Sequence, residues 1–237
     1  MLENENLTRY LFLDIETVPA VYEFENLSEK EKKLFEKKVK YRLNEENTAE
    51  ELYHQAGIWA EFGKIIVIST GFFVKNGEFR IKSFHGHDEK KLLSDFAELL
   101  NSNYFQRKDL KLCAHNGKEF DFPYIARRML INGIPLPKQL QVFGKKPWET
   151  PFCDTMEMWK FGDYKHYTSL DLLTHILGIP SPKTDIEGKD VARIYYEEKD
   201  LERIKEYCER DVIAIAQIML RFSGKELLTD DKIIRVK

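Results

Sequence analysis

The chain has 237 residues, enough for one large domain or two small ones, and its 43% hydrophobic and 32% charged residues are typical of a globular protein. Its three cysteines are far apart and never form a C-x-x-C pattern, which indicates reduced thiols and argues against a disulfide or zinc framework. The polar N-terminus and the lack of any run near ~18 apolar residues predict a cytoplasmic protein without membrane association, and the net charge of -3 argues weakly against a nucleic-acid partner.

Four apolar runs bounded by turn residues predict β-strands, and they lie at 9–15, 65–74, 79–85 and 111–115. Asn76-Gly77 separates the second run from the third and predicts a hairpin turn. Helical periodicity predicts helices at 88–101, 123–132, 168–177 and 200–222. Asp88 and Asp200 are expected to cap the first and the last of these helices, and Pro123 suits the first turn of another.

The segment between the first two strands, residues 28–56, does not continue the strand pattern. Ser28 with Glu31, and Thr48 with Glu51, have the spacing of capping boxes. We therefore predict two short helices before the second strand.

A Lys-rich stretch at 29–42 lies within this segment. This stretch either binds phosphates or forms a solvent-exposed helix face, and its alternation of positive and negative residues favours the solvent-exposed face. Because strands come early and helices late, without a linker or repeat, we predict a single α/β domain over residues 1–237 with a mixed sheet and a helical insertion at 28–56.

The first predicted strand contains two acids, Asp14 and Glu16, among apolar neighbours. Residues i and i+2 of a strand point to the same face, so both carboxylates look the same way. Like charges in a low-dielectric place repel each other and are costly to desolvate. We therefore expect a positive group between them, although a wet edge strand or separate Arg and Lys partners would also explain the pair.

Two more acids occupy unusual places in the sequence. Asp121 lies between two phenylalanines just before the helix that Pro123 starts, where its ordinary role is a helix cap. Asp211 precedes an apolar run in the last helix, and Tyr207, four residues earlier, lies on the same helix face. Ordinary amphipathic patterning would also explain that pair, so each site alone is a weak signal.

Taken together and in this order, the three sites resemble the exonuclease motifs of the DEDD superfamily of 3′→5′ exonucleases. They are most similar to the proofreading exonuclease domain of family B DNA polymerases, through D-I-E-T at Asp14, N-x-x-x-F-D-x-P-Y around Asp121 and Y-x-x-x-D-V at Tyr207. The His subtype has its histidine at the position of Glu206, so the Tyr subtype is indicated. The resemblance spans nearly the whole chain and leaves no room for polymerase domains, so we expect a free-standing exonuclease.

This resemblance implies a ribonuclease H-like fold, a mixed five- or six-stranded sheet flanked by helices with the acids at one end of the central strands. It also implies two metal ions held by Asp14, Glu16, Asp121 and Asp211, with Tyr207 orienting the attacking water. Four carboxylates from distant segments converge stably only if divalent cations neutralise them, and all-oxygen sites favour Mg²⁺ or Mn²⁺. Setting these four charges aside leaves the rest of the chain slightly positive, so a polyanionic substrate is not excluded.

Four residues are candidates for contacts with the substrate, and they are Thr17, Asn116, Phe120 and Lys183. Thr17 would offer its backbone N–H to the terminal nucleotide, and Asn116 would contact a phosphate or sugar. Phe120 would stack on the terminal base, and Lys183 would contact a phosphate. The structural alternatives are a strand-end residue for Thr17, a turn residue for Asn116, core packing for Phe120 and an ordinary loop lysine for Lys183. We interpret Asp154 as a helix cap and His115 as hydrogen-bonded scaffold.

The predicted function is metal-dependent hydrolysis of phosphodiester bonds at the 3′ end of single-stranded DNA by a two-metal-ion mechanism. A ribonuclease D-like enzyme that trims RNA has the same acids and tyrosine, and only the details of the motifs favour DNA. A catalytically silent nucleic-acid-binding module is the alternative of another class. The four acids argue against such a module, because a binder needs cations that pair with phosphates.

Overall fold

The computed structural model describes residues 5–44, 47–163, 165–180 and 186–236. In these residues a six-stranded sheet has the order β5-β4-β1-β2-β3-β6. The strands are β1 Tyr10–Pro19, β2 Gly63–Phe73, β3 Phe79–His85, β4 Lys111–Ala114, β5 Phe152–Asp154 and β6 Ile233–Arg235. The β1–β2 and β2–β3 pairs are antiparallel, whereas the β1–β4, β4–β5 and β3–β6 pairs are parallel. The predicted mixed sheet is confirmed.

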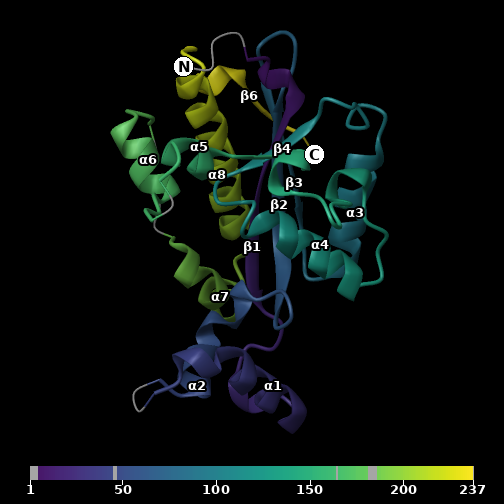
Figure 1. Cartoon of the computed structure of the whole chain (residues 1–237), viewed down its shortest axis with the longest axis vertical. Helices are drawn as coiled ribbons and strands as arrows, with labels where there is room; N and C mark the ends of the chain where they lie inside the picture. Colours follow the sequence, from purple (N-terminus) through teal and green to yellow (C-terminus); the bar gives the residue numbers. More distant parts are fainter. Residues whose placement is uncertain (1–4, 45–46, 164, 181–185, 237) are drawn as a thin grey trace.

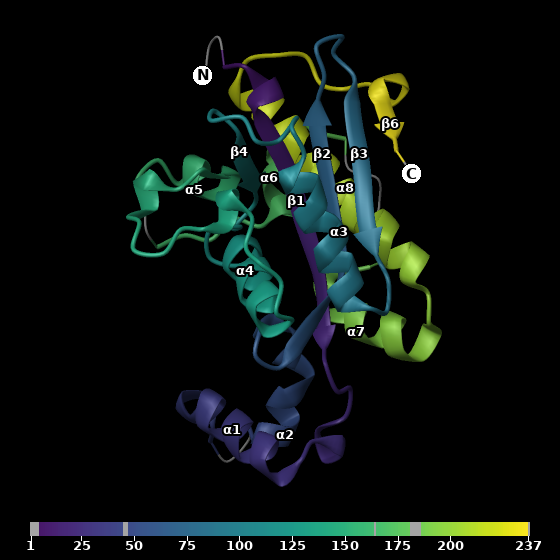
Figure 2. The same ribbon diagram turned by 90° about the vertical axis from the view of Figure 1, so that its right-hand side faces the viewer.

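Helices cover both faces of this sheet (Figures 1 and 2). Helices α3 (Glu89–Asn101) and α4 (Asp121–Ile131) pack on one face, where alternate β1 residues such as Leu11 and Leu13 are fully buried. Helix α8 (Leu201–Phe222) packs on the other face, against Tyr10 and Phe12. The alternation of β1 between two apolar layers explains why this strand is a nearly continuous hydrophobic run.

Residues 20–62 project beyond the end of the sheet where β1 ends and β2 begins (Figure 1). They contain α1 (Glu29–Val39) and α2 (Ala49–Leu52), and both predicted capping boxes are formed at their N-termini. An apolar cluster around Phe35 holds the two helices together. Helix α1 buries Phe35 and Val39 and keeps three lysines exposed on its opposite side, namely Lys30, Lys33 and Lys37.

Shorter helices connect the remaining elements, and they are α5 (Thr155–Lys160), α6 (Leu170–Ile176) and α7 (Val191–Arg193), the last followed by a π-helical turn at Ile194–Glu198. Asp88 and Asp200 cap α3 and α8, as predicted. The predicted hairpin joins β2 to β3, and Gly77 takes a φ of 84° in its turn. Within the described ranges, no helix is both long enough and apolar enough to cross a membrane.

The structure differs from the sequence-based expectation at α4 and at two strands. Helix α4 begins at Asp121 rather than at Pro123, so the proline lies within the first turn, where its missing N–H costs no helical hydrogen bond. Strands β5 and β6 are three residues each, too short for an alternation of apolar and polar residues to be recognised.

Candidate active site

Asp14 and Glu16 lie on β1 just beyond the end of its pairing with β4. That parallel ladder runs from Tyr10 opposite Lys111 to Phe12 opposite Cys113. Strand β2 continues on the other edge of β1, where Asp14 is opposite Ser69. The two acids therefore lie at the carboxyl end of adjacent parallel strands, which is where α/β sheets open and bind ligands.

Asp121 reaches the same place from the start of α4. Only 3% of this residue is exposed, and its carboxylate accepts a hydrogen bond from the backbone N–H of Ile15, on the stretch of β1 beyond its β4 ladder. Its Oδ1 atom is buried without a hydrogen-bond partner. Asp121 is thus the first residue of α4 rather than its cap, and it keeps one carboxylate oxygen available for a ligand.

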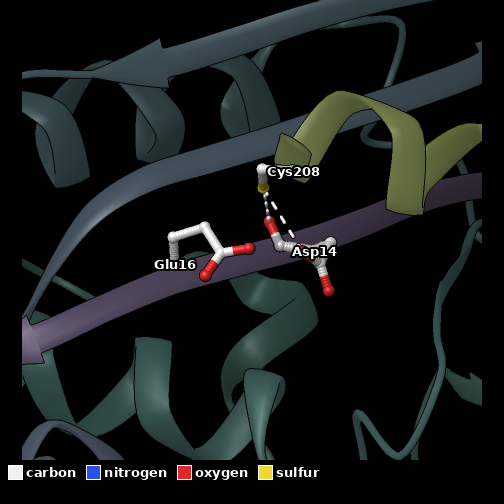
Figure 3. Close-up of side chains that lie close together, drawn as sticks. All are labelled: Asp14, Glu16 and Cys208. Atoms are coloured by element: carbon white, nitrogen blue, oxygen red, sulfur yellow. Dashed lines mark hydrogen bonds between the residues drawn. The ribbon is translucent and has the colours of Figure 1, made fainter. Parts of the chain in front are cut away.

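Helix α8 brings the third motif against β1. The Tyr207 hydroxyl donates a hydrogen bond to Asp211, four residues later on the same helix face. Between them, the Cys208 thiol contacts Asp14 Oδ2 at 3.3 Å (Figure 3). Ligand atoms of Asp14, Glu16 and Cys208 all lie within 4.8 Å of one another.

Cys208 was not recognised from the sequence as a residue of this site. The only indication in the sequence is that Cys208 lies between Tyr207 and Asp211, and a lone buried cysteine most often serves only to fill space in the core. The thiol is fully buried, and burial together with the nearby acids raises its pKa well above the usual range. Cys208 is therefore a neutral thiol that donates to Asp14.

The four acids repel one another in a buried place. Burial raises the pKa of Asp14 and Glu16 well above the usual range, and the charges of Asp121 and Asp211 raise both further. Burial also raises the pKa of Asp121 and of Asp211 to about 7. In the part of the chain that the structure describes, no Lys or Arg forms an ion pair with any of the four. The charge of Arg210 lowers the pKa of Asp211 without forming an ion pair among the described residues, and the oxygen donors of the site suit a hard divalent cation.

We expect the metal-free protein to lose stability as the pH rises from about 5 to about 8. Carboxyl groups of an unfolded chain titrate near ~4, whereas Asp121 and Asp211 have a pKa of about 7 in the folded state. The folded state therefore binds more protons in this window, and its stability falls as the pH rises through the folded pKa. Each kcal/mol lost should lower the melting temperature, measured in chelator, by about 2–4 °C.

A matched pair of variants isolates the acids of the site. Asp121→Asn removes one titrating group and should flatten the pH profile of the melting temperature. Asp95→Asn removes an exposed acid that pairs with Lys91 on α3, and should leave the profile unchanged. Mg²⁺ or Mn²⁺ at pH 8 should restore stability, because ligands that bind only the folded state stabilise it. A wild-type profile that is flat or rises across this window would contradict the buried cluster.

The candidate substrate-binding residues differ in whether their side chains already have partners within the protein. The Thr17 hydroxyl donates to the Gly57 carbonyl at 2.8 Å, so this side chain is already used. Asn116 has a left-handed φ of 62°, and its Oδ1 is buried without a partner. Phe120 is partly buried and lies against Tyr124, with 5.3 Å between ring centroids. Lys183 lies outside the described residues.

Two residues have the structural roles expected from the sequence. Asp154 caps α5 and also accepts the backbone N–H groups of Asn116 and Lys118, which fixes the loop before Asp121. His115 is held through both ring nitrogens, and burial lowers its pKa. Both residues therefore support the second motif as scaffold.

The family model described as a predicted 3′-5′ exonuclease related to the exonuclease domain of PolB matches residues 58–232. The chain belongs to this PolB-related exonuclease family. As a member, it is an enzyme, a 3′→5′ exonuclease with a nucleic acid as substrate, and the family implies metal ions in general. The match includes Asp121, Tyr207 and Asp211 and begins after Asp14 and Glu16.

This PolB-related exonuclease is similar to solved structures of other proteins. A family B DNA polymerase from the hyperthermophilic archaeon Pyrobaculum calidifontis is similar with a TM-score of 0.57 and 14% identity, over 90% of this chain and 24% of the polymerase chain. The RNase domain of the yeast Pop2 protein has a TM-score of 0.45 and 12% identity, over 96% of this chain and 81% of that chain. The structure of the yeast NOT1 MIF4G domain with CAF1 gives a TM-score of 0.46 and 11% identity, over 96% and 84%.

The match to the polymerase confirms the predicted ribonuclease H-like fold. The chain spans about a quarter of the polymerase chain that it matches, so only the fold follows from that likeness. No curated protein matches the chain significantly.

Proposed function

We propose that this exonuclease removes nucleotides from the 3′ end of single-stranded DNA with two divalent cations, Mg²⁺ or Mn²⁺, in its active site. One observation carries the proposal: the carboxylates of Asp14, Glu16, Asp121 and Asp211 meet in a buried place without an ion pair to any Lys or Arg among the described residues. Such a cluster is unfavourable in an empty site and becomes favourable around cations.

The donor set fits this assignment on structural grounds. Asp121 offers the unpartnered Oδ1, and Asp14 and Glu16 lie within ligand-sharing distance of each other. Bound there, a pair of cations would lower the pKa of a water and neutralise charge on the phosphodiester oxygens. The four acids would hold the cations, and the Cys208 thiol keeps the Asp14 carboxylate in place by its hydrogen bond.

Tyr207 would act on the water that attacks the phosphodiester. Its hydroxyl now donates to Asp211 at the edge of the cluster. Burial and the nearby acids raise its pKa far above neutral, so the phenol stays protonated and can donate a hydrogen bond. Asn116 and Phe120 would contact the terminal nucleotide from the loop before α4, and the backbone of Thr17 from β1.

DNA is favoured over RNA because the matched family is related to the exonuclease domain of PolB. The test uses 5′-labelled single-stranded DNA and RNA of one sequence, with Mg²⁺, Mn²⁺ or chelator, resolved as a time course of product ladders. We expect a metal-dependent ladder that shortens from the 3′ end of DNA. Robust cleavage in chelator, or equal degradation of a circular strand, would contradict the proposal. Faster trimming of RNA would favour the ribonuclease alternative.

Tyr207→Phe should lower the turnover rate by about 10²-fold, the lower end of the range for positioned proton-transfer groups. The ring keeps its packing, and only the oriented hydroxyl is lost. Nucleic-acid affinity and the melting temperature are both measured in Ca²⁺ and should hardly change, because the bound cation still neutralises Asp211 after the hydrogen bond of the hydroxyl is lost. Single-turnover kinetics, binding and melting are measured on the same preparations.

Tyr10→Phe is the matched control. The Tyr10 hydroxyl donates to Glu5 at 2.8 Å, near the start of β1 and away from the acids. This variant should keep the wild-type turnover rate. If Tyr207→Phe also keeps it, Tyr207 is a packing residue and the Tyr-subtype mechanism fails.

A further inference from the structure

Tyr167 is an exposed aromatic residue with no role in the mechanism above. Its side chain is 66% exposed, in the segment that leads into α6. Among the described residues, no other ring and no cation lies against its ring. By contrast, the exposed Phe161 lies near Trp159, and the exposed Trp148 is covered by Lys146. Tyr167 thus presents a free aromatic surface. Tyr41 and Phe143 are exposed in the same way, so the place of Tyr167 in the fold, rather than its exposure, distinguishes it.

The backbone beside Tyr167 is fixed to the second motif. The carbonyl of Thr168 accepts a hydrogen bond from His115 Nε2 at 2.8 Å, and His115 Nδ1 contacts the Thr155 hydroxyl at 2.9 Å. Ser169 then caps α6 by accepting the N–H of Leu172. His115 directly precedes the loop that leads to Asp121, so these bonds hold Tyr167 next to that loop.

The charges of two buried acids reach Tyr167. Partial burial raises the pKa of Tyr167, and the negative charges of Asp121 and Asp154 raise it further. Together with the hydrogen bond between Thr168 and His115, this effect places Tyr167 beside the second motif, while its ring remains exposed.

We propose that the ring of Tyr167 stacks on a nucleobase within the last three nucleotides of the substrate strand. This inference rests on the proposed function, because it needs a strand whose 3′ end lies at the acids. A tyrosine side chain has few rotatable bonds to fix on binding when its backbone is already held, and stacking tolerates every base. Tyr167 would thus contribute affinity without sequence preference, together with Phe120 on the α4 side.

The test combines protein variants with base-deleted strands. Affinities of 5′-labelled single strands are measured in Ca²⁺ for an intact strand and for strands with an abasic site at the last, second-last or third-last nucleotide. Tyr167→Ala should weaken binding of the intact strand roughly 5- to 100-fold, the range that loss of one base–aromatic stack gives. One abasic position should weaken wild-type binding but leave Tyr167→Ala unaffected, which identifies the stacked base. Tyr167→Phe should bind like the wild type.

Tyr41→Ala is the matched control, since Tyr41 is 79% exposed and lies beside α1. It should show the wild-type affinity and abasic profile. Equal losses at every abasic position in wild type and Tyr167→Ala, or unchanged affinity of Tyr167→Ala, would overturn the stacking inference alone. Running the same strands as RNA keeps the test valid if the sugar preference is wrong. If wild type neither binds nor shortens either strand, the proposed function fails and the inference fails with it.

Discussion

Asp14→Asn should lower the turnover rate by ~10³-fold or more, while making the metal-free protein more stable. Asp14 is the acid whose pKa is raised by all three of the others, so its charge lies at the centre of the cluster. Metal ions contribute several kcal/mol to stabilising a transition state, and each 1.4 kcal/mol corresponds to about tenfold in rate. Asparagine keeps the shape and can still accept the Cys208 hydrogen bond, but it weakens cation binding.

Two measurements on this variant must agree. Turnover is measured at saturating Mg²⁺ and Mn²⁺, and the melting temperature is measured in chelator at pH 8, where repulsion is largest. Asp95→Asn on the outer face of α3 should change neither. Turnover within tenfold of the wild type would remove Asp14 from the metal site. A lower melting temperature of the metal-free variant would show that the acids do not repel one another.

The sheet could be predicted largely because its central strands are long apolar runs. Strand β1 alternates between two buried layers, and β3 was predicted with its observed bounds. The acids of the site were recognisable for the related reason that they interrupt such runs. Asp14 and Glu16 lie in β1, and Asp211 precedes a buried stretch of α8. Burial explains the apolar residues of such a segment but not a charged one, because burying a charge costs free energy. A charged residue there therefore needs another reason to be present.

Contacts between distant segments were not predictable from local patterns. Cys208 meets Asp14 across 194 positions of sequence, and the motif residues Tyr207 and Asp211 that flank it do not indicate a contact of the thiol itself. The unpartnered Oδ1 of Asp121 and the hydrogen bond between His115 and Thr168, next to Tyr167, also arise from contacts between distant segments. Helix α4 also starts earlier than Pro123 suggests, because the loop fixed by Asp154 delivers Asp121 already in the first turn.

The ion pair between Arg128 and Glu89 is a further contact of this kind, and Arg128→Met should cost about 3–5 kcal/mol of stability. Only 10% of the Arg128 side chain and 8% of the Glu89 side chain are exposed. Arg128 Nε donates to Glu89 Oε1 at 2.8 Å, and another nitrogen donates to the Ala60 carbonyl. Methionine fills the space but leaves the Glu89 charge buried, with only the Ile65 N–H and Asn132 as donors.

Chemical unfolding, with turnover as a second readout, tests this expectation. Arg127→Met is the matched control on α4, because Arg127 is exposed, and its loss should stay within about 0.5 kcal/mol. Glu89→Gln combined with Arg128→Met should recover part of the stability, since glutamine still accepts the Ile65 N–H and removes the unpaired charge. The folded fraction of Arg128→Met should retain wild-type turnover, because the pair joins α3 to α4 on the face away from α8. A loss as small as that of Arg127→Met would mean that water reaches this pair, and that packing alone holds α4 and its Asp121 in place.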